Sequence, residues 1–94
     1  MMRLKFSRRA EIDLENIQDF SVETFGVLVA RNYIQELEAC CFMLRDQPEL
    51  GTKFTFESAE YHRFHKARHV IVYKYTKDCV TITRIVHQSQ QFES

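Results

Sequence analysis

The sequence predicts an α+β domain with an N-terminal strand and a two-helix antiparallel hairpin packed on a small antiparallel β-sheet. Apolar residues recur at helical spacing from residue 10 to residue 44, and Pro48 and Gly51 then interrupt the pattern. Two runs rich in β-branched and aromatic residues follow, as in a β-hairpin. Because the chain has 94 residues, with two glycines and one proline, we expect a single domain over residues 1–94.

Each helix of the predicted hairpin has its own apolar stripe and its own end signals. Residues 2–6 alternate as a strand does, and Ser7 is a favourable N-cap for the first helix. Gly26 ends that helix and leaves only a short connection, which makes the two helices antiparallel neighbours. The first stripe is Ala10, Leu14, Ile17 and Ser21, and the second is Ala30, Tyr33, Ile34, Leu37, Cys40, Cys41 and Leu44.

Three strands are predicted after the helices. Residues 69–75 and 80–86 read as a hairpin that turns at Lys77 and Asp78. Residues 62–66 precede it as a third strand, joined through a turn at residues 66–68.

Three of the four histidines lie at positions 62, 65 and 69. On a helix this spacing would place them on one face, as in a helical metal site. On a strand His62 and His65 point to opposite faces, and a turn separates both from His69. Since no carboxylate or thiol lies nearby at ligand spacing, we expect neither a metal site nor a cofactor.

The three cysteines are interpreted as small apolar packing residues. Cys40 and Cys41 are adjacent, Cys79 is distant, and no C-x-x-C pair is present. No run of residues is long enough to span a bilayer, and the N-terminus does not resemble a signal peptide, so we expect a cytoplasmic protein.

The net charge is zero, but the charges are unevenly placed. Residues 11–60 carry eleven acidic side chains against three basic ones, whereas residues 61–94 carry six basic side chains against two acidic ones. The C-terminal third could therefore present a local positive surface, or the acidic segment could simply be the solvated face of helices.

Arg84 lies within an apolar strand. Strict alternation would place it on the face that holds Val80, Ile82 and Val86. A buried guanidinium needs a carboxylate partner, and Asp13 of the first helix is the foremost candidate. A structural ion pair and an anion-binding role are both open.

The order of these elements, with their local sequences, resembles the RelE/ParE superfamily of bacterial toxins from type II toxin–antitoxin modules. The matching segments are SRRAEIDLENI at residues 7–17, RNYIQELEACCFMLRDQPELG at residues 31–51, YHRFHKARHVIVYKY at residues 61–75 and VTITRIVHQSQQ at residues 80–91. The resemblance implies the α+β fold described above.

The superfamily holds two activities. RelE-like members cut mRNA in the ribosomal A site, and this resemblance would give Arg63, Arg84 and His87 roles in an endoribonuclease. ParE-like members perform no chemistry and inhibit DNA gyrase. The chain is more similar to the ParE-like branch, although residues 88–90 stand where many of those toxins carry a basic pair. We therefore expect a gyrase inhibitor that is not an enzyme, with the ribosome-dependent endonuclease as the alternative.

The resemblance also implies two protein partners. A cognate antitoxin is expected to bind in a groove between the helices and the sheet, which would use the many apolar residues of so small a chain, among them Phe25, Phe42, Phe54 and Phe56. DNA gyrase is expected to be held by exposed side chains, and no membrane is involved. The candidate target-binding residues are Arg63, Lys66, Arg68, His87 and Phe92.

Overall fold

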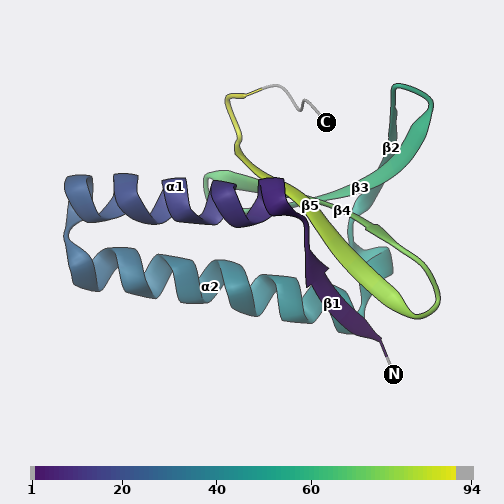
Figure 1. The fold of residues 1–94 in the computed structure, drawn as a ribbon, viewed down its shortest axis with the longest axis horizontal. Helices are drawn as coiled ribbons and strands as arrows, with labels where there is room; N and C mark the ends of the chain where they lie inside the picture. The colour runs from purple at the N-terminus through teal and green to yellow at the C-terminus, as the bar shows by residue number, and fades with distance from the viewer. Residues whose placement is uncertain (1, 91–94) are drawn as a thin grey trace.

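Two antiparallel helices lie side by side and pack on a five-stranded sheet in the computed structural model, which describes residues 2–90 (Figure 1). The α+β fold predicted from the sequence is confirmed. The elements in chain order are β1 (Arg3–Phe6), α1 (Arg8–Phe25), α2 (Val27–Asp46), the short 3₁₀ helix η1 (Pro48–Leu50), β2 (Thr52–Phe56), β3 (Ala59–Lys66), β4 (His69–Tyr75) and β5 (Cys79–His87).

The sheet has the strand order β1-β5-β4-β3-β2. β1 pairs with β5 in parallel, and the other neighbours are antiparallel. Strand β2 was missed from the sequence, and β3 begins at Ala59 rather than at residue 62. The turn between them explains the omission, because Glu57 and Ser58 adopt positive φ angles of 50° and 67° without the glycine or asparagine that normally marks such a hairpin.

Ser7 joins the first helix to the sheet. Its hydroxyl accepts a hydrogen bond from the Ala10 N–H group at 3.1 Å, which confirms the predicted N-cap, and donates one to the Thr83 carbonyl at 2.8 Å. Gly26 alone separates the two helices, at φ 90° and ψ 168°, a conformation almost restricted to glycine. The start and the end of α1 are thus both fixed by residues whose roles the sequence predicts.

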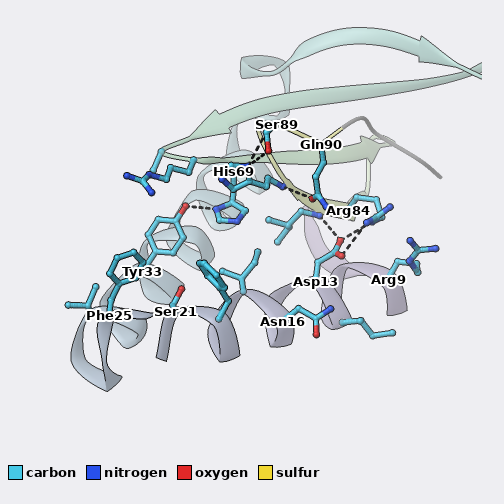
Figure 2. A pocket seen from close by; sticks show the side chains of 18 residues that line it. Arg9, Asp13, Asn16, Ser21, Phe25, Tyr33, His69, Arg84, Ser89 and Gln90 are labelled. Atoms are coloured by element: carbon cyan, nitrogen blue, oxygen red, sulfur yellow. Dashed lines mark hydrogen bonds and ion pairs between the residues drawn. The ribbon is translucent and has the colours of Figure 1, made fainter. Parts of the chain in front are cut away.

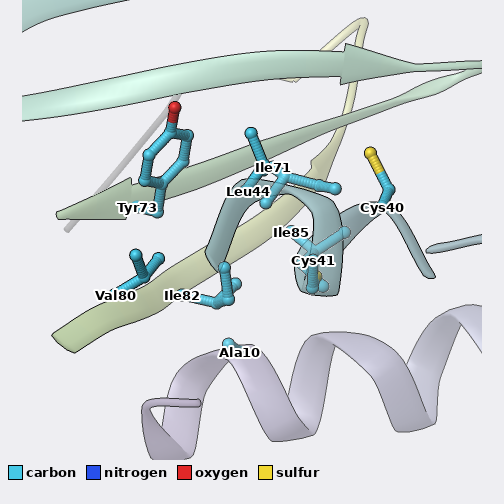
Figure 3. Close-up of a cluster of buried hydrophobic side chains, with 9 residues drawn as sticks. All are labelled: Ala10, Cys40, Cys41, Leu44, Ile71, Tyr73, Val80, Ile82 and Ile85. Carbon is cyan, nitrogen blue, oxygen red and sulfur yellow. The ribbon is translucent and has the colours of Figure 1, made fainter. Parts of the chain in front are cut away.

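The core lies between the helices and one face of the sheet, as Figure 3 shows. Cys40 and Cys41 are buried in it, in agreement with the packing role expected for them, and burial raises the pKa of the Cys41 thiol to about 12. Cys79 is only partly buried at the start of β5. The buried cluster consists of Ala10, Cys40, Cys41, Leu44, Ile71, Tyr73, Val80, Ile82 and Ile85.

The predicted alternation along β5 is wrong after Ile82. A bulge at Thr83 shifts the register, so that Tyr73 pairs with Ile82 but Val72 pairs with Arg84. Ile85, and not Arg84, therefore joins Ile82 on the core face. The Thr83 hydroxyl stabilises the bulge by donating to the Val72 carbonyl at 3.1 Å.

Candidate functional site

A groove of about 840 Å³ separates α1 and the start of α2 from the start of β4 and the end of β5 (Figure 2). One wall is apolar and open to solvent, since the side chains of Phe20, Phe25 and Val29 are 64%, 53% and 52% exposed. The opposite wall is formed by the turn between β3 and β4 and by the last residues of β5. Basic groups border the groove, namely Arg9 and Arg68.

Asp13 and Arg84 close one end of this groove. Arg84 Nε donates to Asp13 Oδ2 at 2.9 Å, and Arg84 Nη2 donates to Asp13 Oδ1 at 3.3 Å, with both side chains 13% exposed. The Ile85 N–H group also donates to Asp13 Oδ2, at 2.9 Å. Because β1 pairs with β5 only as far as Ile82, Asp13 takes the place of a neighbouring strand at this edge. The predicted pairing of Arg84 with Asp13 is confirmed.

Tyr33 and two histidines form the centre of the groove. The Tyr33 hydroxyl lies 2.6 Å from His69 Nδ1, within hydrogen-bond distance, and the tautomer of the imidazole decides which of the two atoms donates. Burial, reinforced by the neighbouring His87, lowers the pKa of His69, which keeps this ring neutral near pH 7.

His87 stands edge-on to His69, with ring centroids 5.5 Å apart. Its Nδ1 atom accepts from the Ser89 N–H group at 3.2 Å and lies 2.7 Å from the Ser89 hydroxyl. Gln90 pairs with the same residue through its own N–H group and its side-chain oxygen, at 2.9 and 3.1 Å. Two polar residues that follow β5 thus hold His87 against the groove.

The candidate target-binding residues do not form one cluster. Arg68 and His87 line the groove, and Lys66 lies beside them at the end of β3. Arg63 is exposed on the other face of the sheet, where its guanidinium lies 5.5 Å from the centre of the Phe54 ring. Phe92 lies outside the described residues.

Two of the candidate endonuclease residues, Arg84 and His87, line the same groove, and the third, Arg63, does not. His87 faces the groove, Arg63 lies on the opposite face of the sheet, and Arg84 is held by Asp13. One acid lies among the described strand residues: Glu60 of β3, which pairs with Lys53 at 3.4 Å.

His62 and His65 lie on opposite faces of β3, as expected for a strand. His62 stacks on Tyr73 with ring centroids 5.5 Å apart, whereas His65 is exposed on the other face. Within residues 2–90, no three His, Cys, Asp or Glu side chains are grouped as metal ligands would be. In the same part of the chain, no helix has the length and apolar character needed to cross a membrane.

Tyr33 and Phe20 were missed as site residues. The sequence places Tyr33 on an apolar helical stripe, but its hydroxyl reaches a histidine 36 positions away. Phe20 lies beside the predicted stripe of α1, and its high exposure is the signal that only the structure gives.

The α+β fold is the one that the sequence resemblance implies. The sequence profile of the family described as "ParE toxin of type II toxin-antitoxin system, parDE" matches residues 4–92. The chain belongs to this family of ParE toxins.

A similar protein supports that assignment, and a solved structure shares the fold. The chain is 35% identical over 89 residues to a protein of Caulobacter vibrioides named Toxin ParE1, covering 95% of this chain and 92% of the relative. It also resembles a solved structure titled "Chromosomal ParDE TA system from P. aeruginosa", with a TM-score of 0.78 and 22% identity over 93% of this chain and 96% of the other. The second likeness concerns the fold.

Proposed function

We propose that this toxin inhibits DNA gyrase by binding it, and that a cognate antitoxin neutralises it by occupying the groove between α1, α2 and the sheet. Both partners would meet the toxin in the cytoplasm. The family and the name of the Caulobacter vibrioides relative support the role of a toxin in a toxin–antitoxin module.

The proposed mechanism of neutralisation depends on where two side chains, Arg68 and His87, lie. Arg68 and His87, both candidate gyrase contacts, line the groove in which we place the antitoxin. An antitoxin segment in the groove would cover them, so that antitoxin and gyrase compete for one surface. The apolar wall and the basic border favour a segment with apolar anchors and acidic flanking residues.

The remote position of Arg63 and the pairing of Arg84 with Asp13 favour binding over RNA cleavage. Attack by a ribose 2′-hydroxyl needs a proton acceptor, a proton donor and cations around a single phosphate. Here Arg63 lies on the opposite face of the sheet from His87, and Asp13 engages the Arg84 guanidinium. A protein contact makes no such demand, because it can use exposed residues spread over a surface.

A charge in the apolar wall should weaken antitoxin binding. We expect Phe20→Asp to raise the Kd for the cognate antitoxin at least tenfold, because an apolar anchor is replaced by a carboxylate in a groove built for acidic partners. Phe20 is 64% exposed, so the fold should be retained. Calorimetric titration of the purified complex partners gives the Kd.

The matched control is Phe42→Asp, in which the same substitution is made on the outer surface of α2, where Phe42 is 49% exposed and lies outside the groove. Equal loss of affinity in the two variants would show that the antitoxin does not depend on the groove.

Substitutions in the β3–β4 turn test whether this turn contacts gyrase. We expect Arg68→Gln together with Lys66→Gln to weaken inhibition of gyrase supercoiling about tenfold, because charged groups steer and hold a partner at a protein interface. Arg31→Gln, which removes an exposed charge from α2, serves as the control. If the turn variant inhibits gyrase as strongly as the unmodified toxin does, this turn does not contact gyrase.

A further inference from the structure

The structure separates the charges of this neutral chain between its two layers. The five strands contain seven lysine and arginine residues and a single acid, Glu60. Helices α1 and α2 together hold eight acidic side chains against four basic ones. The uneven charge seen in the sequence therefore becomes a basic sheet beneath an acidic helix layer.

Four of the strand cations lie on the face of the sheet that points away from the helices. In β1, Leu4 and Phe6 pack against the core, so the alternating Arg3 and Lys5 point outward, and both are exposed. In β4, Tyr73 is in the core and its neighbour Lys74 is exposed on the outer face. The fourth cation, in β3, is Arg63, which pairs with Val72 on that outer face.

Strand pairing aligns these side chains across the sheet. Lys5 and Lys74 both pair with Thr81, and Tyr61 pairs with Phe54. The contact of Lys74 with the Tyr61 ring joins these two sets into one cross-strand row. Lys5 and Lys74 lie two strands apart in this row, about 10 Å. Arg63 stands in the adjacent row, diagonal to Lys74.

No acid among the described strand residues neutralises this face. Glu60 alternates with Tyr61 and lies on the other side of the sheet, paired with Lys53. The nearest partners of two cations are aromatic rings: Lys74 Nζ lies 4.5 Å from the centre of the Tyr61 ring, and Arg63 lies 5.5 Å from that of Phe54. These contacts hold the cations in place without cancelling their charge.

We propose that this outer face, defined by Arg3, Lys5, Arg63 and Lys74, binds the phosphate backbone of duplex DNA. Spaced, exposed cations complement a polyanion, and without an element that could enter a groove they would read no sequence. The inference rests on the proposed function for its occupant, because the proposed target, gyrase, acts on duplex DNA. The antitoxin groove lies on the helix side, so both surfaces could be occupied together.

Direct binding of DNA by the full-length toxin, without gyrase, tests this inference. Fluorescence anisotropy with a labelled 20-base-pair duplex should give a micromolar Kd at about 50 mM salt, typical of non-specific binding. Lys5→Gln with Lys74→Gln should raise that Kd at least tenfold. The slope of log K against log salt should fall by about two, one for each lost phosphate contact.

The control is Arg31→Gln with Arg45→Gln, which removes the same charge from α2 in the opposite layer and should leave the Kd within about twofold. An equal loss in both double variants would attribute binding to bulk charge and overturn the proposal. Absence of binding by the unmodified toxin, or tenfold tighter binding to RNA than to duplex DNA, would also overturn it.

A pull-down with gyrase in the absence of DNA separates this inference from the proposed function. If the toxin binds DNA but not gyrase, the outer face is supported as a DNA-binding surface and the gyrase proposal is overturned. If the toxin binds gyrase but not DNA, the gyrase proposal is supported and DNA binding by the outer face is overturned.

Discussion

Replacing Gly51 by alanine should destabilise the toxin by about 3 kcal/mol, at the upper end of the usual cost of overpacking. Gly51 has an ordinary φ of −76°, so the reason is space and not backbone conformation. An added Cβ would clash with the Tyr73 hydroxyl and lie 2.9 Å from the Arg63 carbonyl oxygen. Chemical denaturation measures the loss.

The clash would also break two linked, partly buried hydrogen bonds of the Tyr73 hydroxyl. The Gly51 N–H group donates to the Tyr73 hydroxyl at 2.8 Å, and that hydroxyl donates to the Pro48 carbonyl at 2.6 Å. The exposed neighbour Thr52, changed to alanine, is the control and should cost less than about 0.5 kcal/mol. A loss below about 1 kcal/mol in Gly51→Ala would show that η1 can move away from the sheet.

Removing the carboxylate of Asp13 should cost about 3 kcal/mol as well. Asp13→Ala removes the carboxylate that accepts hydrogen bonds from the largely buried Arg84 guanidinium and from the Ile85 N–H group. Arg84→Met should cost much less, because an apolar side chain then replaces the charge and Asp13 keeps its bond to Ile85. Denaturation of the two variants gives the comparison.

Glu11→Ala, an exposed carboxylate of the same helix, controls for loss of an acid and should change stability by less than about 0.5 kcal/mol. A loss in Asp13→Ala no larger than that in Glu11→Ala would contradict the structural ion pair. A stable Arg84→Met variant that has lost toxicity would instead assign Arg84 a role in target binding.

Elements with strong local signals could be predicted from the sequence. Ser7 caps α1, Gly26 separates the helices, and the β-branched runs form β4 and β5, because each depends on neighbouring residues. Strand β2 could not be predicted, since its turn residues, Glu57 and Ser58, are atypical for a tight hairpin.

The site was harder to predict, because its geometry is tertiary. The bulge at Thr83 depends on hydrogen bonds to Ser7 and Val72, which the local alternation of β5 does not reveal. The Asp13–Arg84 pair was predictable, since a guanidinium in an apolar strand needs a carboxylate. The contact of Tyr33 with His69 was not, because a tyrosine on a helical stripe has no feature that shows where its hydroxyl will lie.

The most direct measurement is a gyrase supercoiling and DNA-cleavage assay with the purified toxin, run beside a programmed ribosome carrying mRNA. We predict that the toxin blocks supercoiling or accumulates cleaved DNA, that added antitoxin reverses the effect, and that the mRNA stays intact. Unaffected gyrase together with codon-positioned mRNA cuts that disappear in His87→Ala would contradict the account and identify the toxin as a ribosome-dependent endonuclease.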